Sequence, residues 1–284
     1  MAKILIIGCG AIGLQLAEVL SANGHQITGL KRHPPVLQPS KINYFTADIS
    51  LRANLEDLDA DFKHVFFIAS TDGRNEKSYR DIYEIGLDNL LNRFSQSACN
   101  PDWIFVSSTS VYGQSQGEWV DENSLAQPDN ITSKLIRQAE QKLMDANPNN
   151  IIVRFAGIYG PGREYLLRMA RQAPLIQQDP PYFTNRIHQD DCVNVLSFLF
   201  EKRLIGLALE QCYLASDDDP APLWNVISWL AERMNCPPPV IQSAGSKGGM
   251  NKRCINTRLK ALGYQFKYPG YKEGYSELIN KTGN

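Results

Sequence analysis

A short glycine loop near the start of the chain constrains the fold more than any other feature. The apolar run KILII at residues 3–7 leads directly into GCGAIG, and apolar residues at helical spacing follow to residue 22. Gly8, Gly10 and Gly13 have G-x-G-x-x-G spacing, which provides a tight turn, room for a pyrophosphate against the backbone, and close packing of helix on strand. A helix starting at Ala11 and Ile12 presents free N–H groups and a positive dipole end to phosphates. We therefore predict a dinucleotide-binding unit; the alternative is a purely structural glycine turn.

Strand and helix patterns alternate over the first 160 residues. Two long patterns predict helices at about residues 75–97 and 131–146. Short apolar runs predict further strands at residues 25–30, 42–47, 64–70, 103–108 and 151–157. This alternation is typical of a parallel sheet covered on both faces. The expected fold class is α/β, with a Rossmann-type doubly wound parallel sheet.

The regular alternation of strand and helix patterns ends after Gly160. A loop and a short helix follow, then a strand at about residues 182–188, a helix at 190–200 and a last sheet strand at 210–216. We expect residues 1–160 to form the dinucleotide-binding domain, completed by about 184–216. The stretches CPPPV and GSKGGMNKR are rich in turn residues. We therefore expect residues 161–183 and 217–284 to form a small, looser substrate-binding portion.

Composition narrows the class of partner. The net charge is −1, and no run of like charge indicates a nucleic-acid surface. No apolar run approaches the roughly 18 residues that span a bilayer. The six cysteines and four histidines are dispersed without metal-ligand spacing, so no metal site is expected. A cytoplasmic protein with a small-molecule substrate, and with no nucleic-acid or membrane partner, is the expectation.

The end of the second predicted strand bears on the choice of dinucleotide. NAD-binding folds place an acid there for the ribose 2′-OH. This strand ends in GLKRHP, with Lys31 and Arg32 and no acid in the local sequence. A guanidinium suits a 2′-phosphate. We predict NADP in preference to NAD; the alternative is that both basic residues are solvated surface groups.

Five motifs occur in a familiar order along the chain. They are FTADIS at residues 45–50, SSTSVYG at 107–113, RFAGIYGPG at 154–162, RIHQDD at 186–191 and NKRCINTRLKALGYQF at 251–266. Together they resemble the extended short-chain dehydrogenase/reductase superfamily of nucleotide-sugar epimerases and dehydratases, nearly from end to end. The resemblance implies cofactor contacts from the glycine loop, from Asp48 at the adenine, from Ala69 after the fourth strand and from Lys134 at the ribose. It also implies that Ser108 hydrogen-bonds the substrate oxygen.

Two positions depart from the family pattern. Ile7 stands where such proteins usually carry the first glycine, and Asn130 stands where the family's Y-x-x-x-K motif has its tyrosine, four residues before Lys134. The chain is therefore similar to an atypical branch of the NAD-dependent epimerase/dehydratase family that lacks the catalytic tyrosine. Asparagine has no titratable proton near neutral pH, so it cannot act as the acid or base. Losing a positioned acid costs roughly 10²–10⁴ in rate.

Three interpretations of this loss stay open. In the first, Tyr112 supplies the proton, although the tyrosine of a V-Y-G turn is more often a packing residue. In the second, Ser108 and a bound water act with Lys134 in a slower or different hydride transfer. In the third, the protein binds a dinucleotide as a sensor and catalyses nothing, because fold alone does not determine function.

The resemblance also bears on assembly and substrate. Family members often pair through two long helices, here about residues 75–97 and 131–146, and the first is apolar on more than one face, which favours a homodimer. Its apolar residues are Tyr79, Ile82, Tyr83, Ile85, Leu87, Leu90, Leu91 and Phe94. Four arginines could bind an anionic substrate, although scattered arginines are usually solvated: Arg154, Arg163, Arg168 and Arg253.

Overall fold

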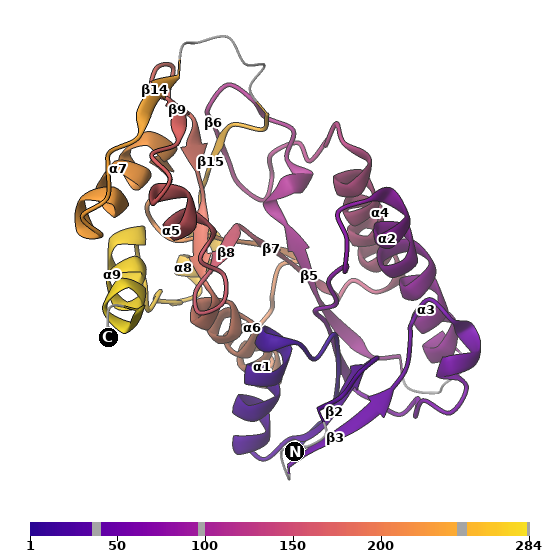
Figure 1. Cartoon of the computed structure of the whole chain (residues 1–284). Helices are drawn as coiled ribbons and strands as arrows, with labels where there is room; N and C mark the ends of the chain where they lie inside the picture. Colours follow the sequence, from indigo (N-terminus) through magenta and orange to yellow (C-terminus); the bar gives the residue numbers. More distant parts are fainter. Residues whose placement is uncertain (36–40, 96–99, 243–248, 283–284) are drawn as a thin grey trace. The chain divides into compact units, whose positions relative to one another are not determined.

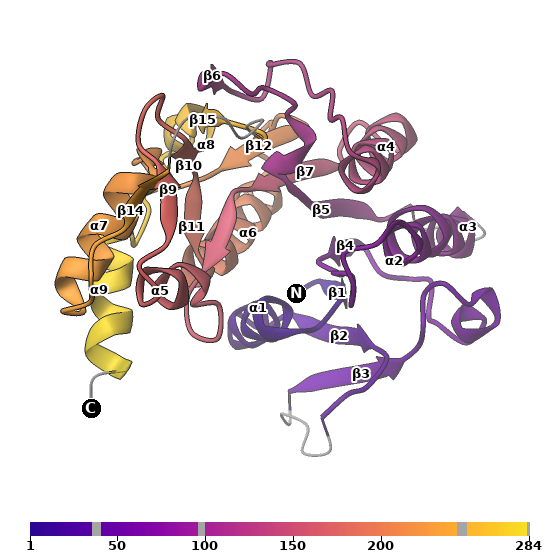
Figure 2. The same ribbon diagram turned by 45° about the horizontal axis from the view of Figure 1, so that its top comes forward.

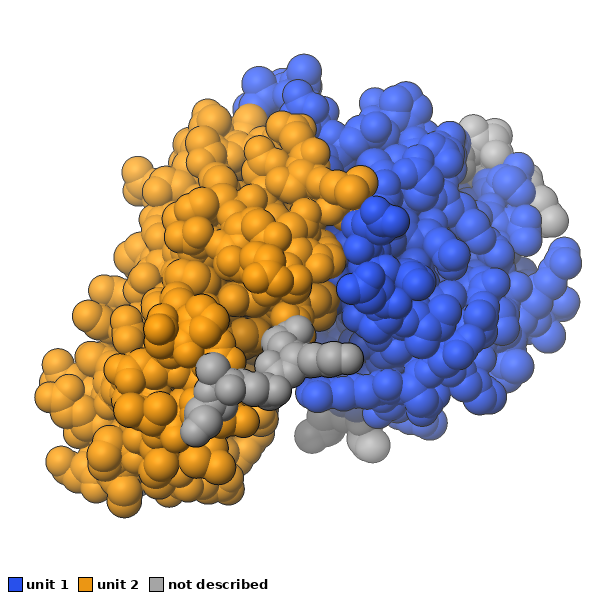
Figure 3. Space-filling model, turned by 90° about the horizontal axis from the view of Figure 1, so that it is seen from above, with its two compact units in different colours: residues 1–111, 127–154, 193–213 blue, residues 112–126, 155–192, 214–284 orange. Residues whose placement is uncertain are grey.

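The computed structural model describes residues 1–35, 41–95, 100–242 and 249–282. These separate into two compact units, coloured in Figure 3. Unit 1 comprises residues 1–111, 127–154 and 193–213, and unit 2 comprises 112–126, 155–192 and 214–284. Residues 112–126 and 155–160, which we expected in the first domain, therefore lie in unit 2, as do residues 184–192 and 214–216.

A seven-stranded sheet forms the centre of unit 1. Its strand order is β12-β7-β5-β4-β1-β2-β3, and the pairs from β3 to β5 run parallel (Figures 1 and 2). This is the predicted doubly wound arrangement, whose strand order reverses at β1. The strands are β1 (Lys3–Ile7), β2 (Gln26–Lys31), β3 (Ile42–Thr46), β4 (His64–Phe67), β5 (Asp102–Ser108), β7 (Ile151–Phe155) and β12 (Cys212–Ala215). The last residues of β7 and β12 belong to unit 2.

Helices cover both faces of this sheet. Helix α1 (Ala11–Ala22) lies on one face with α6 (Gln189–Leu204), whose Phe200 packs edge-on against Phe66 of β4 (Figure 2). The other face carries α4 (Ile131–Ala146) and the helical stretch before β5. That stretch was predicted as one helix over residues 75–97. It consists of α2 (Glu76–Tyr79), the π-helical η2 (Arg80–Gly86) and α3 (Leu87–Ser95), and residues 96–97 lie outside the described residues.

Short elements complete the described chain. In unit 1 these are η1 (Arg52–Leu55) and η3 (Thr109–Val111). In unit 2 the strand pairs are β8 (Gly157–Tyr159) with β11 (Arg186–His188), β9 (Leu175–Gln177) with β14 (Val240–Gln242), β10 (Phe183–Thr184) with β13 (Ala221–Pro222), and β6 (Glu118–Val120) with β15 (Lys252–Cys254). The helices of unit 2 are α5 (Tyr165–Ala170), α7 (Leu223–Arg233), α8 (Thr257–Ala261) and α9 (Tyr271–Thr282).

Unit 2 has a more extensive packed core than the sequence predicted. We expected a loose C-terminal portion, yet α5, α7 and α9 surround an apolar core that includes Tyr159, Leu230 and Tyr275. The motif at residues 251–266 forms strand β15 and the short α8, and the chain then continues into α9. The apolar spacing of α7 and α9 is a signal that the prediction missed. Residues 243–248, part of the turn-rich stretch, lie outside the described residues.

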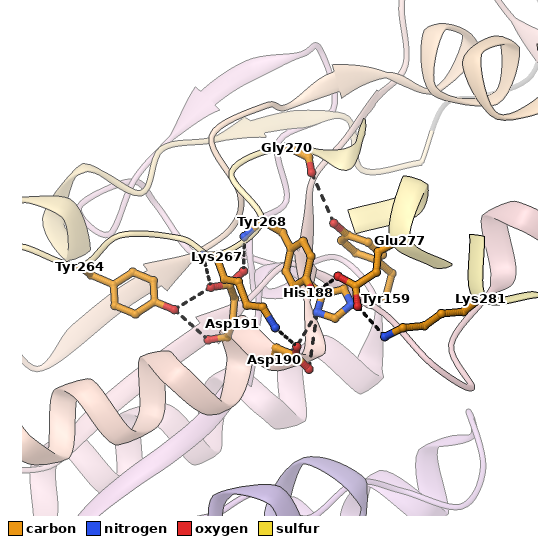
Figure 4. Close-up of polar contacts among 10 residues, drawn as sticks. All are labelled: Tyr159, His188, Asp190, Asp191, Tyr264, Lys267, Tyr268, Gly270, Glu277 and Lys281. Atoms are coloured by element: carbon orange, nitrogen blue, oxygen red, sulfur yellow. Dashed lines mark hydrogen bonds and ion pairs between the residues drawn. The ribbon is translucent and has the colours of Figure 1, made fainter. Parts of the chain in front are cut away.

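The start of α6 is tied to the segment between α8 and α9 (Figure 4). The fully buried carboxylate of Asp191 accepts hydrogen bonds from the Tyr264 hydroxyl at 2.9 Å and from the backbone N–H groups of Lys267 and Tyr268 at 2.8 and 3.0 Å. His188 lies next to it in a packed position, 4.0 Å between ring centroids from Tyr268. Asp191 therefore fastens two segments about 75 residues apart in sequence.

None of the described helices is both long and apolar enough to cross a membrane. Within the described ranges, no group of three or more His, Cys, Asp or Glu residues could hold a metal ion.

Candidate dinucleotide and catalytic site

The first glycine of the loop is required by both conformation and space. Gly8 follows β1 with φ +87°, a conformation that favours glycine. A Cβ atom at this position would meet the backbone of Ala69 at 2.4 Å. The loop after β1 and the segment after β4 therefore touch backbone to backbone, which places Ala69 beside the glycine turn.

The other two glycines divide the remaining roles. A Cβ atom on Gly13 would meet the Gly8 carbonyl oxygen at 2.6 Å, so Gly13 permits the close packing of α1 on the loop. Gly10 is exposed, and apart from its two chain neighbours no heavy atom of the described residues lies within 4 Å of where its Cβ would be. It immediately precedes α1, whose first N–H groups have no partner within the helix. This open position at a helix N-terminus fits a pyrophosphate.

Cys9 fills space beneath this loop. Its side chain is 2% exposed and packs against Gly29 of β2, where a Cβ would lie 2.9 Å from its Sγ. Burial raises the pKa of the Cys9 thiol, although a hydrogen bond with the Tyr44 hydroxyl opposes the shift. A buried thiol with a raised pKa is a poor nucleophile.

The end of β2 carries both basic residues expected at the adenosine ribose. Arg32 forms an exposed ion pair with Asp72, 2.5 Å between Nη2 and Oδ2, and this hydrogen bond raises the pKa of Arg32. Asp72 follows β4, so only the tertiary structure brings an acid to a strand end that has none in its local sequence. Asp48 lies after β3, where its Oδ1 accepts hydrogen bonds from the Ser50 N–H and hydroxyl. Burial acts to raise the pKa of Asp48, but these bonds and the charge of Arg32 outweigh it and lower that pKa.

Ser108 and Lys134 occupy the ends of two neighbouring elements of unit 1. Ser108 is the last residue of β5, and its Oγ accepts a hydrogen bond from the Ser110 N–H at 3.1 Å. Its own hydroxyl proton thus stays available for donation. Lys134 is exposed in the first turn of α4, and no carboxylate among the described residues pairs with it.

Asn130 is the N-cap of α4, a role that the sequence interpretation did not assign. Its Oδ1 accepts hydrogen bonds from the Ser133 N–H at 2.9 Å and from the Thr132 hydroxyl at 2.8 Å. Asparagine is among the best N-cap residues, because its side-chain oxygen satisfies an N–H group that the helix leaves unpaired. The P-D-N-I-T-S sequence before a helical pattern carries this signal.

A buried ion pair fixes α4 against the sheet. Glu140 is fully buried and accepts two hydrogen bonds from Arg154 of β7, at 2.9 and 2.7 Å, and one from the Ser107 hydroxyl at 2.5 Å. Arg154, a candidate for binding an anionic substrate, is therefore engaged in the core. The sequence holds a signal for this pair, because Glu140 shares the apolar helix face of Ile136 and Leu143, and Arg154 interrupts the apolar run IIVRF.

The model of the NAD dependent epimerase/dehydratase family matches residues 4–203. The chain belongs to this family. The predicted membership and the predicted Rossmann-type fold are thus confirmed, and with them the general class of NAD(P)-binding, oxidoreductase-like proteins.

Three relatives show the range of similarity. A proposed NAD-dependent epimerase/dehydratase from Methylobacillus flagellatus is 33% identical, with a TM-score of 0.84 and coverage of 100% of this chain and 99% of that one. Protein YeeZ of Escherichia coli is 26% identical over 278 residues, which cover 95% of this chain and 97% of YeeZ. UDP-glucose 4-epimerase of Thermus thermophilus, solved with NAD, is 19% identical over 96% of each chain with a TM-score of 0.75, a likeness of fold alone.

Tyr112 was the candidate to replace the tyrosine usual in the epimerase/dehydratase family. Its side chain is fully buried in unit 2, and its hydroxyl donates a hydrogen bond to the Asp121 carbonyl at 2.7 Å. A buried phenol bonded to the backbone has the environment of a packing residue. This contact favours the packing interpretation over the acid–base one.

Proposed function

We propose that this chain is an NADP(H)-binding, epimerase/dehydratase-like oxidoreductase with altered acid–base chemistry, acting on a carbonyl or sugar-type small molecule. The observation that carries the proposal is the glycine loop, where open space above Gly10 meets the N-terminus of α1. When bound, the nicotinamide would supply or accept a hydride. NAD and UDP-glucose accompany solved epimerases of the same fold, which supports a dinucleotide and a small substrate here.

Each site residue has a proposed role. Gly8 makes the turn and Gly13 lets α1 pack on it, so that Gly10, Ala11 and Ile12 hold the pyrophosphate with backbone groups. Asp48 contacts the adenine, Ala69 is a further cofactor contact, and Lys134 holds the nicotinamide ribose. Ser108 donates a hydrogen bond to the substrate oxygen. Because Oδ1 of Asn130 is bonded to its own helix, we assign the proton to a water held near Ser108 and Lys134 rather than to Asn130.

Arg32 is the proposed contact for a ribose 2′-phosphate. Its present partner, Asp72, competes for the same guanidinium. Both side chains of this ion pair are exposed, so breaking it costs little free energy. We expect Asp72→Asn to tighten NADPH binding several-fold and leave NADH binding unchanged, and Arg32→Ala to weaken NADPH alone. Fluorescence titration of both nucleotides measures this. NADH bound as tightly as NADPH by the parent protein would overturn the preference.

Catalysis is tested by restoring the family residue. A panel of carbonyl compounds and keto sugars is added to the NADPH-bound parent protein and to the variants Asn130→Tyr and Asn130→Phe. Oxidation of the NADPH is measured for each compound. Both variants lose the cap and add similar bulk, but only the tyrosine adds a hydroxyl. Turnover by the parent supports the enzyme proposal. Turnover by the tyrosine variant alone would instead support a second candidate.

The second candidate is a non-catalytic NADP(H) sensor. The observation that favours it is the Asn130 side chain, which serves the helix in place of a proton donor. Tight NADPH binding without turnover on the panel is the result expected of a sensor. No binding of either nucleotide would reject both candidates.

We further propose a homodimer through the helices α2, η2, α3 and α4. Ile85 of η2 and Ile131 of α4 are 43% and 41% exposed. Burying such apolar surface against a second copy is favourable. Sedimentation at micromolar concentration tests it, and a monomer under those conditions would contradict it.

A further inference from the structure

Of the four arginines considered for an anionic substrate, Arg253 has a distinctive setting. It lies on β15 in unit 2, directly paired with Trp119 of β6. Its guanidinium carbon lies 4.5 Å from the centroid of the Trp119 ring and 4.7 Å from that of Phe183. Two rings from separate segments therefore hold one guanidinium by cation–π contacts.

The backbone fixes this guanidinium further. Its Nε donates a hydrogen bond to the Gly117 carbonyl at 2.8 Å, and the Gly117 N–H in turn donates to the Asn251 carbonyl at 2.8 Å. Gly117 has φ +79°, and a Cβ atom there would lie 3.3 Å from the Phe183 ring. Asn251 also binds the Phe183 N–H with its Oδ1 at 2.8 Å. The position of Arg253 is thus built by three segments of unit 2.

Among the described residues, no hydrogen-bond or ion-pair partner contacts the Nη1 and Nη2 edge of this guanidinium. Once Nε is bonded, Nη1 and Nη2 remain as a fork that matches two oxygens of a phosphate or carboxylate. Among the described residues no carboxylate pairs with Arg253, and the adjacent Glu118 accepts a hydrogen bond from the Gln116 N–H instead. Arg253 is half-buried, which makes an ionic contact there stronger than at an exposed arginine.

We propose that Arg253, oriented by Trp119 and Phe183, is an anion-recognition site of unit 2 that binds a phosphate or carboxylate group of the substrate. The assignment to substrate rests on the proposed function; anion binding itself does not. Ordering of the guanidinium before binding favours affinity, because less side-chain freedom is lost.

The test titrates the full-length protein with sodium phosphate and, separately, with sodium acetate, at constant ionic strength in chloride. Tryptophan fluorescence reports binding, with Trp119→Phe identifying the Trp119 contribution. Arg253→Lys keeps the charge and the aliphatic stem but lacks the fork. Arg171→Lys is the matched control, at an exposed arginine of unit 2 that contacts no aromatic ring among the described residues. We expect saturable binding that weakens at least tenfold in Arg253→Lys and stays unchanged in Arg171→Lys. The tighter of the two anions identifies the substrate group.

Equal affinity of Arg253→Lys and the parent, or no saturable binding of either anion by the parent, would overturn the proposal. If Arg253→Lys does not fold, the Arg253 Nε–Hε NMR resonance of the parent is followed instead, and its failure to shift with either anion has the same meaning. NADPH titration of the same variants separates the two proposals. Anion binding without NADPH binding would reject the dinucleotide proposal and retain the Arg253 site.

Discussion

At the scale of single residues, Asn130 has a structural role at the position where we predicted the family tyrosine to be missing. The side chain caps α4 in the structure, with two hydrogen bonds to its Oδ1. We expect Asn130→Ala to lower the free energy of unfolding by about 1 kcal/mol, whereas Asn130→Asp, which keeps the acceptor, should change it little. Urea denaturation followed by circular dichroism measures both.

Asn75 offers a matched control, because it caps α2 in the same way, accepting from the Ser78 N–H at 2.9 Å. If Asn75→Ala destabilises the protein and Asn130→Ala does not, capping is not the role of Asn130. A loss in both variants would agree with the role seen in the structure.

His64 gives the stability of unit 1 a dependence on pH. Its ring packs against Phe200, 5.0 Å between centroids, and burial, with help from the charge of Arg203, lowers the pKa of His64 from 6.5 to about 4. Between these values the unfolded chain binds a proton that the folded chain does not. Stability should therefore fall as the pH drops from 6.5 to 4, by on the order of 3 kcal/mol from this group.

Denaturation curves at several pH values test this expectation. His64→Gln should flatten the pH dependence over that window, while His33→Gln, at an exposed position, should leave the slope as it is. An unchanged slope in His64→Gln would show that other groups cause the acid sensitivity.

At the scale of elements, the orientation of α4 depends on the Glu140–Arg154 pair. Breaking a buried pair leaves one charge without compensation and typically costs about 3–5 kcal/mol. We expect Glu140→Gln and Arg154→Met each to destabilise the protein by about that amount. The double variant should cost less than the sum of the two, which a double-mutant cycle in urea measures. Strict additivity would mean that the pair does not act as one unit.

The π-helical η2 shows what element prediction misses. Apolar spacing located a helix at residues 75–97, but spacing does not distinguish an α-helix from a stretch with one wider turn. The side chain of Ile49 approaches the site of a Cβ on Gly86 to 2.6 Å. A contact with a residue 37 positions away is not visible in the local pattern.

At the scale of the whole molecule, unit 2 is held together by contacts distant in sequence, with Asp191 among them (Figure 4). We expect Asp191→Asn to speed hydrogen exchange at the amides of Lys267 and Tyr268, which donate to its carboxylate, and to cost about 1–3 kcal/mol. Mass spectrometry of exchanged peptides measures this. Asp190→Asn is the control, since its carboxylate binds the exposed Nζ of Lys267. Equal exchange in both variants would contradict the role of Asp191.

Sequence by itself determined the sheet, the glycine loop and the helix that carries Lys134. These depend on local chemistry: apolar runs form buried strands, glycine permits the turn at Gly8, and helical spacing places Lys134 one turn after Asn130. The motifs then indicated the family, and the family match agrees with them.

Only the tertiary structure decided which charges meet. In the folded chain Asp72 pairs with Arg32, Glu140 is buried in an ion pair with Arg154, and Arg253 makes cation–π contacts with Trp119 and Phe183. Each of these contacts joins residues 14 to 134 positions apart in the sequence. The energy of a charge depends on its burial and its partner, and both are set by the folded chain rather than by neighbours along it.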